Sequence, residues 1–239
     1  MSDQLPALPE DFDRVLGIVA HPDDLEYGAA GAIARWTAQG RWAGYVMVTR
    51  GEAGIQDLEP GRCGPLRAEE QIAAARLVGV DTVDFLDHPD GMIEYGTALR
   101  RDITAAIRRH QPDILITLNN RATWGPGGPR NSPDHRAVGE AVLDAAGDAG
   151  NQWIFPEAGP AWNGVRAVLI AGSPEPTHAV DISGTLDASI ASLRAHGAYL
   201  DGLGEHPMAD AEAFLSMMAG QAAGRFGGVP ATLFERVPC

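Results

Sequence analysis

The sequence predicts an α/β fold in which a mostly parallel sheet is covered by helices on both faces, with a helical C-terminal part. Short, continuously apolar segments of strand length alternate with longer segments of helical periodicity along most of the chain. Such alternation is typical of parallel sheets, because a crossover helix joins each pair of strands. After Asp181 the periodicity is helical, which predicts the helical C-terminal part.

The predicted strands are short, apolar and rich in β-branched residues, as buried parallel strands are. In chain order they cover residues 14–20 (RVLGIVA), 43–49 (AGYVMVT), 82–86 (TVDFL), 113–118 (DILITL) and 165–171 (VRAVLIA).

The predicted helices cover residues 28–39, 65–78, 97–109 and 135–149, and then residues 186–200 and 211–225 in the C-terminal part. Gly40 and Gly79 follow two of these helices and are placed to end them as C-caps. The chain has no repeat, low-complexity tract or linker, so residues 1–239 are predicted to form a single domain.

Composition excludes several classes of protein. A net charge of −14 and a pI near 4.8 argue against a nucleic-acid partner, because such proteins neutralise phosphates with Lys and Arg. The first residues lack the basic flank and apolar core of a signal peptide, and no apolar run would span a bilayer. Cys63 and Cys239 are far apart and suit a reducing compartment. We expect a cytoplasmic protein without a membrane partner.

Three polar segments follow predicted strands, where ligands gather in parallel sheets. They are HPDDLE (residues 21–26), TRGEAG (residues 49–54) and the long loop of residues 119–139. A loop of that length, with four glycines and three prolines, is more often functional than idle.

The first and third segments carry residues that suit a metal ion. His21 and Asp24 lie on either side of a proline turn, and Asp134-His135 opens a helix after the long loop. Two neutral imidazoles and one carboxylate leave a fourth tetrahedral position open, as in catalytic zinc sites. Asp23 would then lie beside the metal and take a proton from water. The alternative is that these aspartates only N-cap the two helices.

The same segments resemble a known family. The stretches AHPDDLEYGAAG, TRGEAG, RAEEQIAAARLVGV, LDHPDGMI and PDHRAVGEAVLDA occur in the order found in the zinc-dependent de-N-acetylases of the LmbE/PIG-L family, and PATLFERV is similar to the family's closing strand. The resemblance implies a Rossmann-like fold and hydrolysis of N-acetyl groups on amino sugars or related small molecules. It implies one zinc ion per chain, with another divalent metal as the alternative, and it implies His21, Asp24 and His135 as ligands and Asp23 as the general base.

The resemblance also suggests residues that contact substrate. Arg67 and Asp90 match positions that contact substrate hydroxyls in sugar-processing members. Glu52, in the loop after the second strand, is a further candidate substrate contact.

One position departs from the family pattern. Ser132 stands where many members have a histidine that stabilises the oxyanion, and a hydroxyl donates a hydrogen bond without carrying a charge. The departure predicts lower activity or a different substrate. His196 resembles a helix histidine that faces the site and would compensate; the alternative is a partly exposed helix residue.

These observations predict a metal-dependent hydrolase that removes an N-acetyl or related acyl group from an amino sugar or a small natural-product intermediate. An amidase of thiol conjugates is one alternative, since only the leaving group differs. A metal-binding or small-molecule-binding module with impaired catalysis is another, although an intact Asp23 argues against it. The partner is a small N-acylated molecule, and the sequence is compatible with a homo-oligomer.

Overall fold

The structure is a computed structural model that describes residues 4–239, and it is built on a seven-stranded sheet. The strand order is β3-β2-β1-β4-β5-β7-β6. The strands are β1 (Arg14–Val19), β2 (Trp42–Met47), β3 (Thr82–Phe85), β4 (Ile114–Leu118), β5 (Ala167–Ala171), β6 (His178–Asp181) and β7 (Ala231–Pro238). The α/β fold with a mostly parallel sheet is therefore confirmed.

The strands β1 to β5 are all parallel, and the chain order reverses between β1 and β4. From β1 the chain builds outward through β2 and β3, and it then returns to place β4 on the other side of β1. In open parallel sheets a crevice forms at such a point, outside the carboxyl ends of the strands, because the two following loops diverge. β7 is antiparallel to both of its neighbours, β5 and β6.

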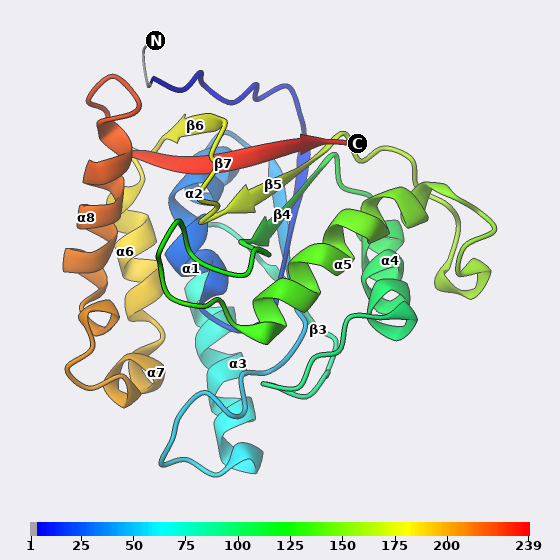
Figure 1. Ribbon diagram of the computed structural model, residues 1–239, viewed down its shortest axis with the longest axis horizontal. Coiled ribbons are helices and arrows are strands. Elements are labelled where there is room, and N and C mark those ends of the chain that lie inside the picture. The colour runs from blue at the N-terminus through cyan, green and yellow to red at the C-terminus, as the bar shows by residue number, and fades with distance from the viewer. Residues whose placement is uncertain (1–3) are drawn as a thin grey trace.

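Helices cover both faces of the sheet (Figure 1). On one face, α4 (Thr97–His110) and α5 (Pro133–Gly150) pack on the sheet through Ile103, Ile107 and Val142, with neighbouring apolar residues. The core of the other face includes Ile33, Trp36, Val78 and further residues. The remaining helices are α1 (Asp24–Gly28), α2 (Ala30–Ala38), α3 (Pro60–Leu77), α6 (Leu186–Arg194), α7 (Gly197–Gly202) and α8 (Ala211–Ala223), with short 3-10 helices η1 (Pro156–Ala158) and η2 (Pro207–Ala209).

The packing of α1 on β1 places the start of that helix. Leu25 is buried against β1, where a Cβ on Gly17 would lie only 2.6 Å from the Leu25 Cδ1 atom. Only glycine leaves room for this close approach. Asp24 and Glu26, on either side of Leu25, are consequently held at the carboxyl end of β1.

Several element boundaries differ from the sequence-based expectation. The helix predicted over residues 28–39 is α2, and a separate short helix, α1, precedes it; the two are separated at Ala29, whose φ of −144° is not helical. The helix predicted from residue 65 begins earlier, with Pro60 at its first turn, where a missing N–H costs nothing. The helix predicted over residues 186–200 is divided at His196 into α6 and α7. The strand β6 was not predicted; it forms by antiparallel pairing with the distant β7.

Across residues 4–239, none of the helices combines the length and the apolar character that crossing a membrane requires.

Candidate active site

The site begins with a strained turn at the carboxyl end of β1. Asp23 has a φ of 91°, in the left-handed region that non-glycine residues rarely occupy. Its backbone N–H donates to Gln71 Oε1 over 3.0 Å, and the Gln71 Nε2 donates to Glu26 Oε1 over 3.0 Å. All three side chains are buried. Such a conformation persists only where the surroundings hold it, and Gln71 of α3 supplies that support.

Three of the predicted ligand residues meet at the β1–β4 crevice. The His135 Nε2 lies 3.2 Å from His21 Nδ1 and 3.1 Å from Asp24 Oδ1. The His21 Nδ1 lies 3.6 Å from Asp24 Oδ2. One donor atom from each residue falls within 4.8 Å of the others, which is the spacing that a shared metal ion requires. The structure thus brings together residues that are more than a hundred positions apart in the sequence.

The outward-facing ring nitrogens of both histidines are also bonded. His135 Nδ1 lies 3.0 Å from the Asn131 Oδ1, and His21 Nε2 lies 3.3 Å from Asp134 Oδ2 and 3.1 Å from Asp90 Oδ1. An oxygen acceptor at one ring nitrogen fixes the proton there and leaves the other nitrogen free to bind a metal. His21 would therefore bind through Nδ1 and His135 through Nε2.

Buried Asp134 has a second task besides orienting His21. Its carboxylate accepts hydrogen bonds from the backbone N–H groups of Gly91 (2.7 Å) and Ile93 (3.2 Å). The loop after β3 is thereby tied to the start of α5, next to the ligand histidine. The sequence indicated Asp134 only together with His135 as a candidate ligand. In the structure the Asp134 carboxylate contacts the His21 ring and the loop after β3.

The charges within the cluster shift its titration. Burial lowers the pKa of His21, but the carboxylates of Asp24, Asp134 and Asp90 outweigh burial and hold that pKa well above its ordinary value. Burial raises the pKa of Asp24, but the imidazoles of His135 and His21 outweigh it and hold that pKa well below its ordinary value. Asp24 therefore stays ionised, as a carboxylate ligand of a divalent cation must be.

Asp23 lies beside this cluster and is bound by a different set of residues. Its Oδ1 accepts a hydrogen bond of 2.9 Å from the Arg67 Nη2. Burial raises the pKa of Asp23, and the guanidinium of Arg67 offsets only part of that rise. The Arg67 guanidinium also lies 4.3 Å from the centroid of the Tyr199 ring of α7. A buried carboxylate with a raised pKa beside the cluster is suited to act as a general base.

The structure shows different environments for the predicted substrate contacts. Arg67 is 2% exposed, and besides Asp23 it donates to the backbone oxygens of Pro22 and Gly51. Asp90 accepts from the Ala53 N–H, and its own N–H donates to Glu52 Oε1. Asp90 and Glu52 thus join the loops after β2 and β3 at the rim of the site, whereas Arg67 faces the base. Their contacts with substrate stay predictions.

The two candidates for oxyanion stabilisation also occupy different places. The Ser132 Oγ accepts a 3.2 Å hydrogen bond from the Asp134 N–H and so caps α5, which leaves its hydroxyl proton free to donate elsewhere. His196 is 0% exposed, and its Nε2 lies 3.6 Å from Glu26 Oε2. It is therefore not the partly exposed helix residue of the alternative interpretation. The oxyanion role of either residue stays a prediction.

The capping alternative for the aspartates does not hold. Asp23 is the N-cap of α1 but makes no capping hydrogen bond with its side chain, and the N-cap of α5 is Ser132.

Sequence reasoning missed Gln71, Asn131 and Tyr199. Asn131, four residues before His135, had the local spacing that could have indicated it; the other two come from distant segments with no local signal.

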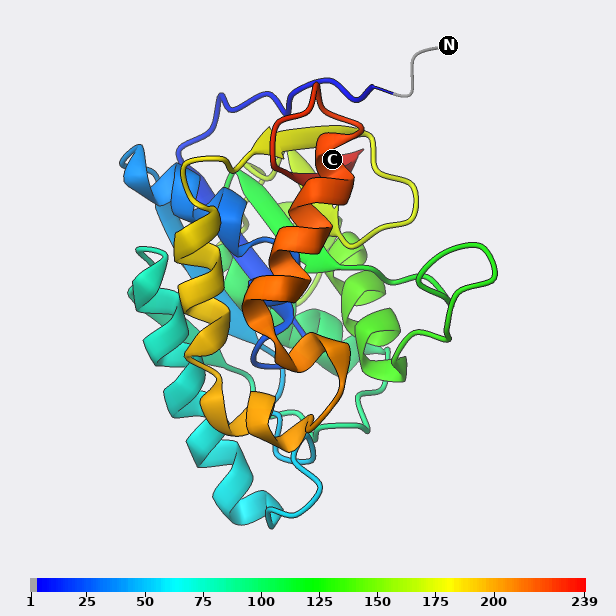
Figure 2. The same ribbon diagram turned by 90° about the vertical axis from the view of Figure 1, so that its left-hand side faces the viewer.

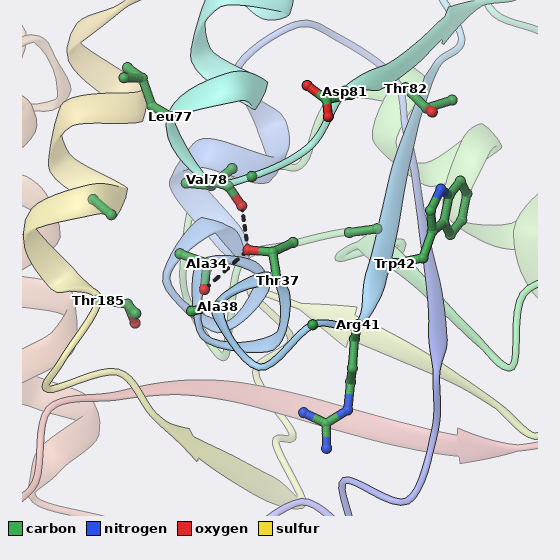
Figure 3. A pocket seen from close by; sticks show the side chains of 14 residues that line it. Ala34, Thr37, Ala38, Arg41, Trp42, Leu77, Val78, Asp81, Thr82 and Thr185 are labelled. Carbon is green, nitrogen blue, oxygen red and sulfur yellow. Dashed lines mark hydrogen bonds between the residues drawn. The ribbon is translucent and has the colours of Figure 1, made fainter.

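A surface cavity lies away from these residues (Figure 3). It is a cavity of about 670 Å³ at the amino ends of β2 and β3, and Trp42, Asp81 and Thr82 are among the residues that line it. The hydroxyl of Thr37, which also lines it, is bonded to the backbone oxygens of Ala34 and Val78. None of the predicted ligand residues lines this cavity. The candidate active site is therefore identified by the chemistry of its side chains and not by a cavity.

Comparison with known proteins identifies the family of the chain. A sheet of this order, with His and Asp donor atoms converging at its β1–β4 switch point, defines an α/β protein with a candidate metal site. Residues 16–146 match the family PIG-L, described as GlcNAc-PI de-N-acetylase, and the chain belongs to this family. The match extends from β1 to α5, so it includes all three predicted ligand residues and Asp23.

Individual relatives are deacetylases. The chain is 29% identical to a diacetylchitobiose deacetylase of Thermococcus kodakarensis, with 78% of this chain and 70% of the relative covered. It is 28% identical to a 1D-myo-inositol 2-acetamido-2-deoxy-alpha-D-glucopyranoside deacetylase of Kineococcus radiotolerans, with 77% and 68% covered. The solved structure of an N,N'-diacetylchitobiose deacetylase from Pyrococcus horikoshii matches with a TM-score of 0.83 at 25% identity, over 96% of this chain and 85% of the other.

Proposed function

We propose that this protein is a zinc-dependent hydrolase that removes an N-acetyl group from an amino sugar or a small natural-product intermediate. The observation that carries the proposal is the convergence of donor atoms from His21, Asp24 and His135 beside the buried carboxylate of Asp23. Deacetylase relatives that act on acetylated amino sugars support it.

The residues present fit a divalent metal. His21 Nδ1, His135 Nε2 and a carboxylate oxygen of Asp24 would hold it, and the nitrogen-rich donor set favours zinc over magnesium or calcium. When bound, the ion supplies Lewis acidity, which polarises the amide carbonyl and makes water more acidic. We expect about one ion per chain.

Asp23 would carry the proton through the reaction. Its carboxylate accepts a proton from the attacking water as the C–O bond forms, and the protonated group then donates that proton to the amide nitrogen as the C–N bond breaks. The second proton of the water stays on the new carboxyl group, so the products are acetic acid and an amine, which at neutral pH exchange that proton to give acetate and an ammonium group. Arg67 fixes the carboxylate by the 2.9 Å bond to Oδ1. The hydroxyl of Ser132 or the ring of His196 would stabilise the charge that develops on the carbonyl oxygen.

The variant Asp23→Asn tests the assignment of the base. The amide oxygen can still accept from Arg67, so the local structure should survive, but it cannot accept the proton of water. We expect turnover of an N-acetylated amino sugar to fall about 10²–10⁴-fold while metal content is unchanged. Wild-type turnover in this variant would contradict the role of Asp23, and loss of metal would make it a ligand.

The variant His21→Ala tests the ligands. Elemental analysis should show loss of most of the bound metal, whereas the matched control His178→Ala, on the distant edge strand β6, should keep it. Equal metal content in the two variants would refute the ligand assignment.

A further inference from the structure

Trp124 presents an exposed aromatic surface next to the ligand cluster. Its side chain lies in the loop between β4 and α5, and its residue is 38% exposed. The ring centroid lies 5.8 Å from that of His135, with the two planes at 85°. The indole therefore borders the cluster on the side of His135, whereas Asp23 is held from the side of α3.

The loop that carries Trp124 is a small tied arm. Thr123 and Arg130 form an isolated antiparallel bridge, and the Trp124 N–H donates to the Pro129 oxygen over 3.1 Å. At the base of the arm, the buried Asn131 side chain donates to the backbone oxygen of Asn119 over 2.6 Å. The arm projects from the body of the molecule beside the start of α5 (Figure 2). These bonds hold the arm in one conformation beside the ligand cluster.

The ligand His135 and this arm share one anchor. Asn131 bonds the His135 ring through its Oδ1 atom, and it bonds the arm through its Nδ2 atom. Asn131 therefore holds the arm in a fixed position relative to His135.

The Trp124 indole packs against Gly172, the residue that follows β5. Gly172 has a φ of +65°, and a Cβ built on it would lie 3.0 Å from the Trp124 Cζ3 atom. A side chain there would be strained and would displace the ring. With His135 on one side and Gly172 beneath, the indole is held in place while part of it stays open to solvent.

We propose that Trp124 stacks against a second ring of the substrate, so that the enzyme prefers an N-acetylated amino sugar within a glycoside to the free monosaccharide. An acetamido group must reach the cluster and Asp23, and the partly exposed indole lies beside that cluster. The C–H groups of a sugar ring pack on such a surface, and a fixed aromatic ring loses little entropy on binding. The inference rests on the proposed deacetylase function and deepens it.

Kinetics on two substrates tests the proposal. For wild type, Trp124→Ala, Trp124→Phe and Trp153→Ala, kcat/KM is measured on N-acetylglucosamine and on N,N'-diacetylchitobiose, together with metal content. The ratio of kcat/KM, disaccharide over monosaccharide, should fall about tenfold in Trp124→Ala and much less in Trp124→Phe, which keeps an aromatic face.

Trp153→Ala is the matched control. Trp153 is 79% exposed and follows the far end of α5, about 27 Å along the helix from Pro133. Its removal should leave the ratio at the wild-type value. A wild-type ratio in Trp124→Ala, or an equal fall in Trp153→Ala, would overturn the proposal without affecting the proposed function.

A binding measurement separates the two hypotheses further. If the wild type hydrolyses neither sugar, the proposed function fails for these substrates, and calorimetry of chitobiose binding to the metal-loaded protein still tests the surface. Weaker binding to Trp124→Ala than to Trp153→Ala supports the stacking role. Equal affinity, or no binding to the wild type, overturns it.

Discussion

Replacing Gln71 by leucine should loosen the turn that carries Asp23. Gln71 is 0% exposed, and its side-chain amide makes two buried hydrogen bonds: one accepted from the Asp23 N–H and one donated to Glu26, each 3.0 Å long. Leucine has a similar volume, so the change removes hydrogen bonding with little change of packing. It leaves a buried N–H and a buried carboxylate oxygen each without one partner.

The magnitude follows from these two bonds. A buried polar group left without its partner costs about 1–3 kcal/mol, so the free energy of unfolding should fall by about 2–6 kcal/mol. The left-handed backbone at Asp23, with φ at 91°, itself costs about 1–3 kcal/mol to maintain. Without Gln71 the turn can relax, and the carboxylate then moves away from its reacting position. We therefore expect kcat to fall more than KM changes.

Urea unfolding and steady-state kinetics measure the two effects, with Gln152→Leu as the control because Gln152 is exposed near the C-terminal end of α5. The metal content of Gln71→Leu should equal that of wild type, since Gln71 bonds none of the three ligand side chains among its described contacts. A free energy of unfolding within about 0.5 kcal/mol of wild type, together with unchanged kcat, would refute the reasoning.

Two further predictions concern the ion pair between Arg121 and Glu235 and the N-cap of α5. Burial raises the pKa of Glu235, but hydrogen bonds from Arg121 and Ser173 outweigh it and hold that pKa below its ordinary value of 4.5. The ionised Glu235 carboxylate therefore stabilises the fold above that value, and this contribution is lost as pH falls through the lowered pKa. Thermal unfolding at several pH values should show that Glu235→Gln is less stable than wild type at pH 7 and equally stable in acid. A deficit that is constant with pH would contradict this linkage. Ser132→Ala removes the cap on the Asp134 N–H, and we expect a loss of about 1 kcal/mol in urea unfolding with metal content retained; unchanged stability would show that the cap contributes nothing.

The sequence was sufficient for features that depend on neighbouring residues. The five parallel strands were predicted because strands buried on both faces are continuously apolar. The cluster of His21 and Asp24 was predicted because both flank one turn at a strand end. His135 followed from the helix start after a long loop. Boundaries were less accurate, since the break at Ala29 depends on how α1 and α2 pack rather than on propensity.

The tertiary structure decided everything that joins distant segments. Only the strand order places the loops after β1 and β4 on either side of one crevice, and only this brings His21 to Asp134 and His135. Gln71 reaches Asp23 across 48 positions, and Tyr199 reaches Arg67 because α7 folds back over α3. The short β6 and its antiparallel pairing with β7 depend in the same way on a distant partner. A local pattern records burial and turns, but a hydrogen bond between segments depends on how the whole chain packs, and no short stretch of sequence encodes it.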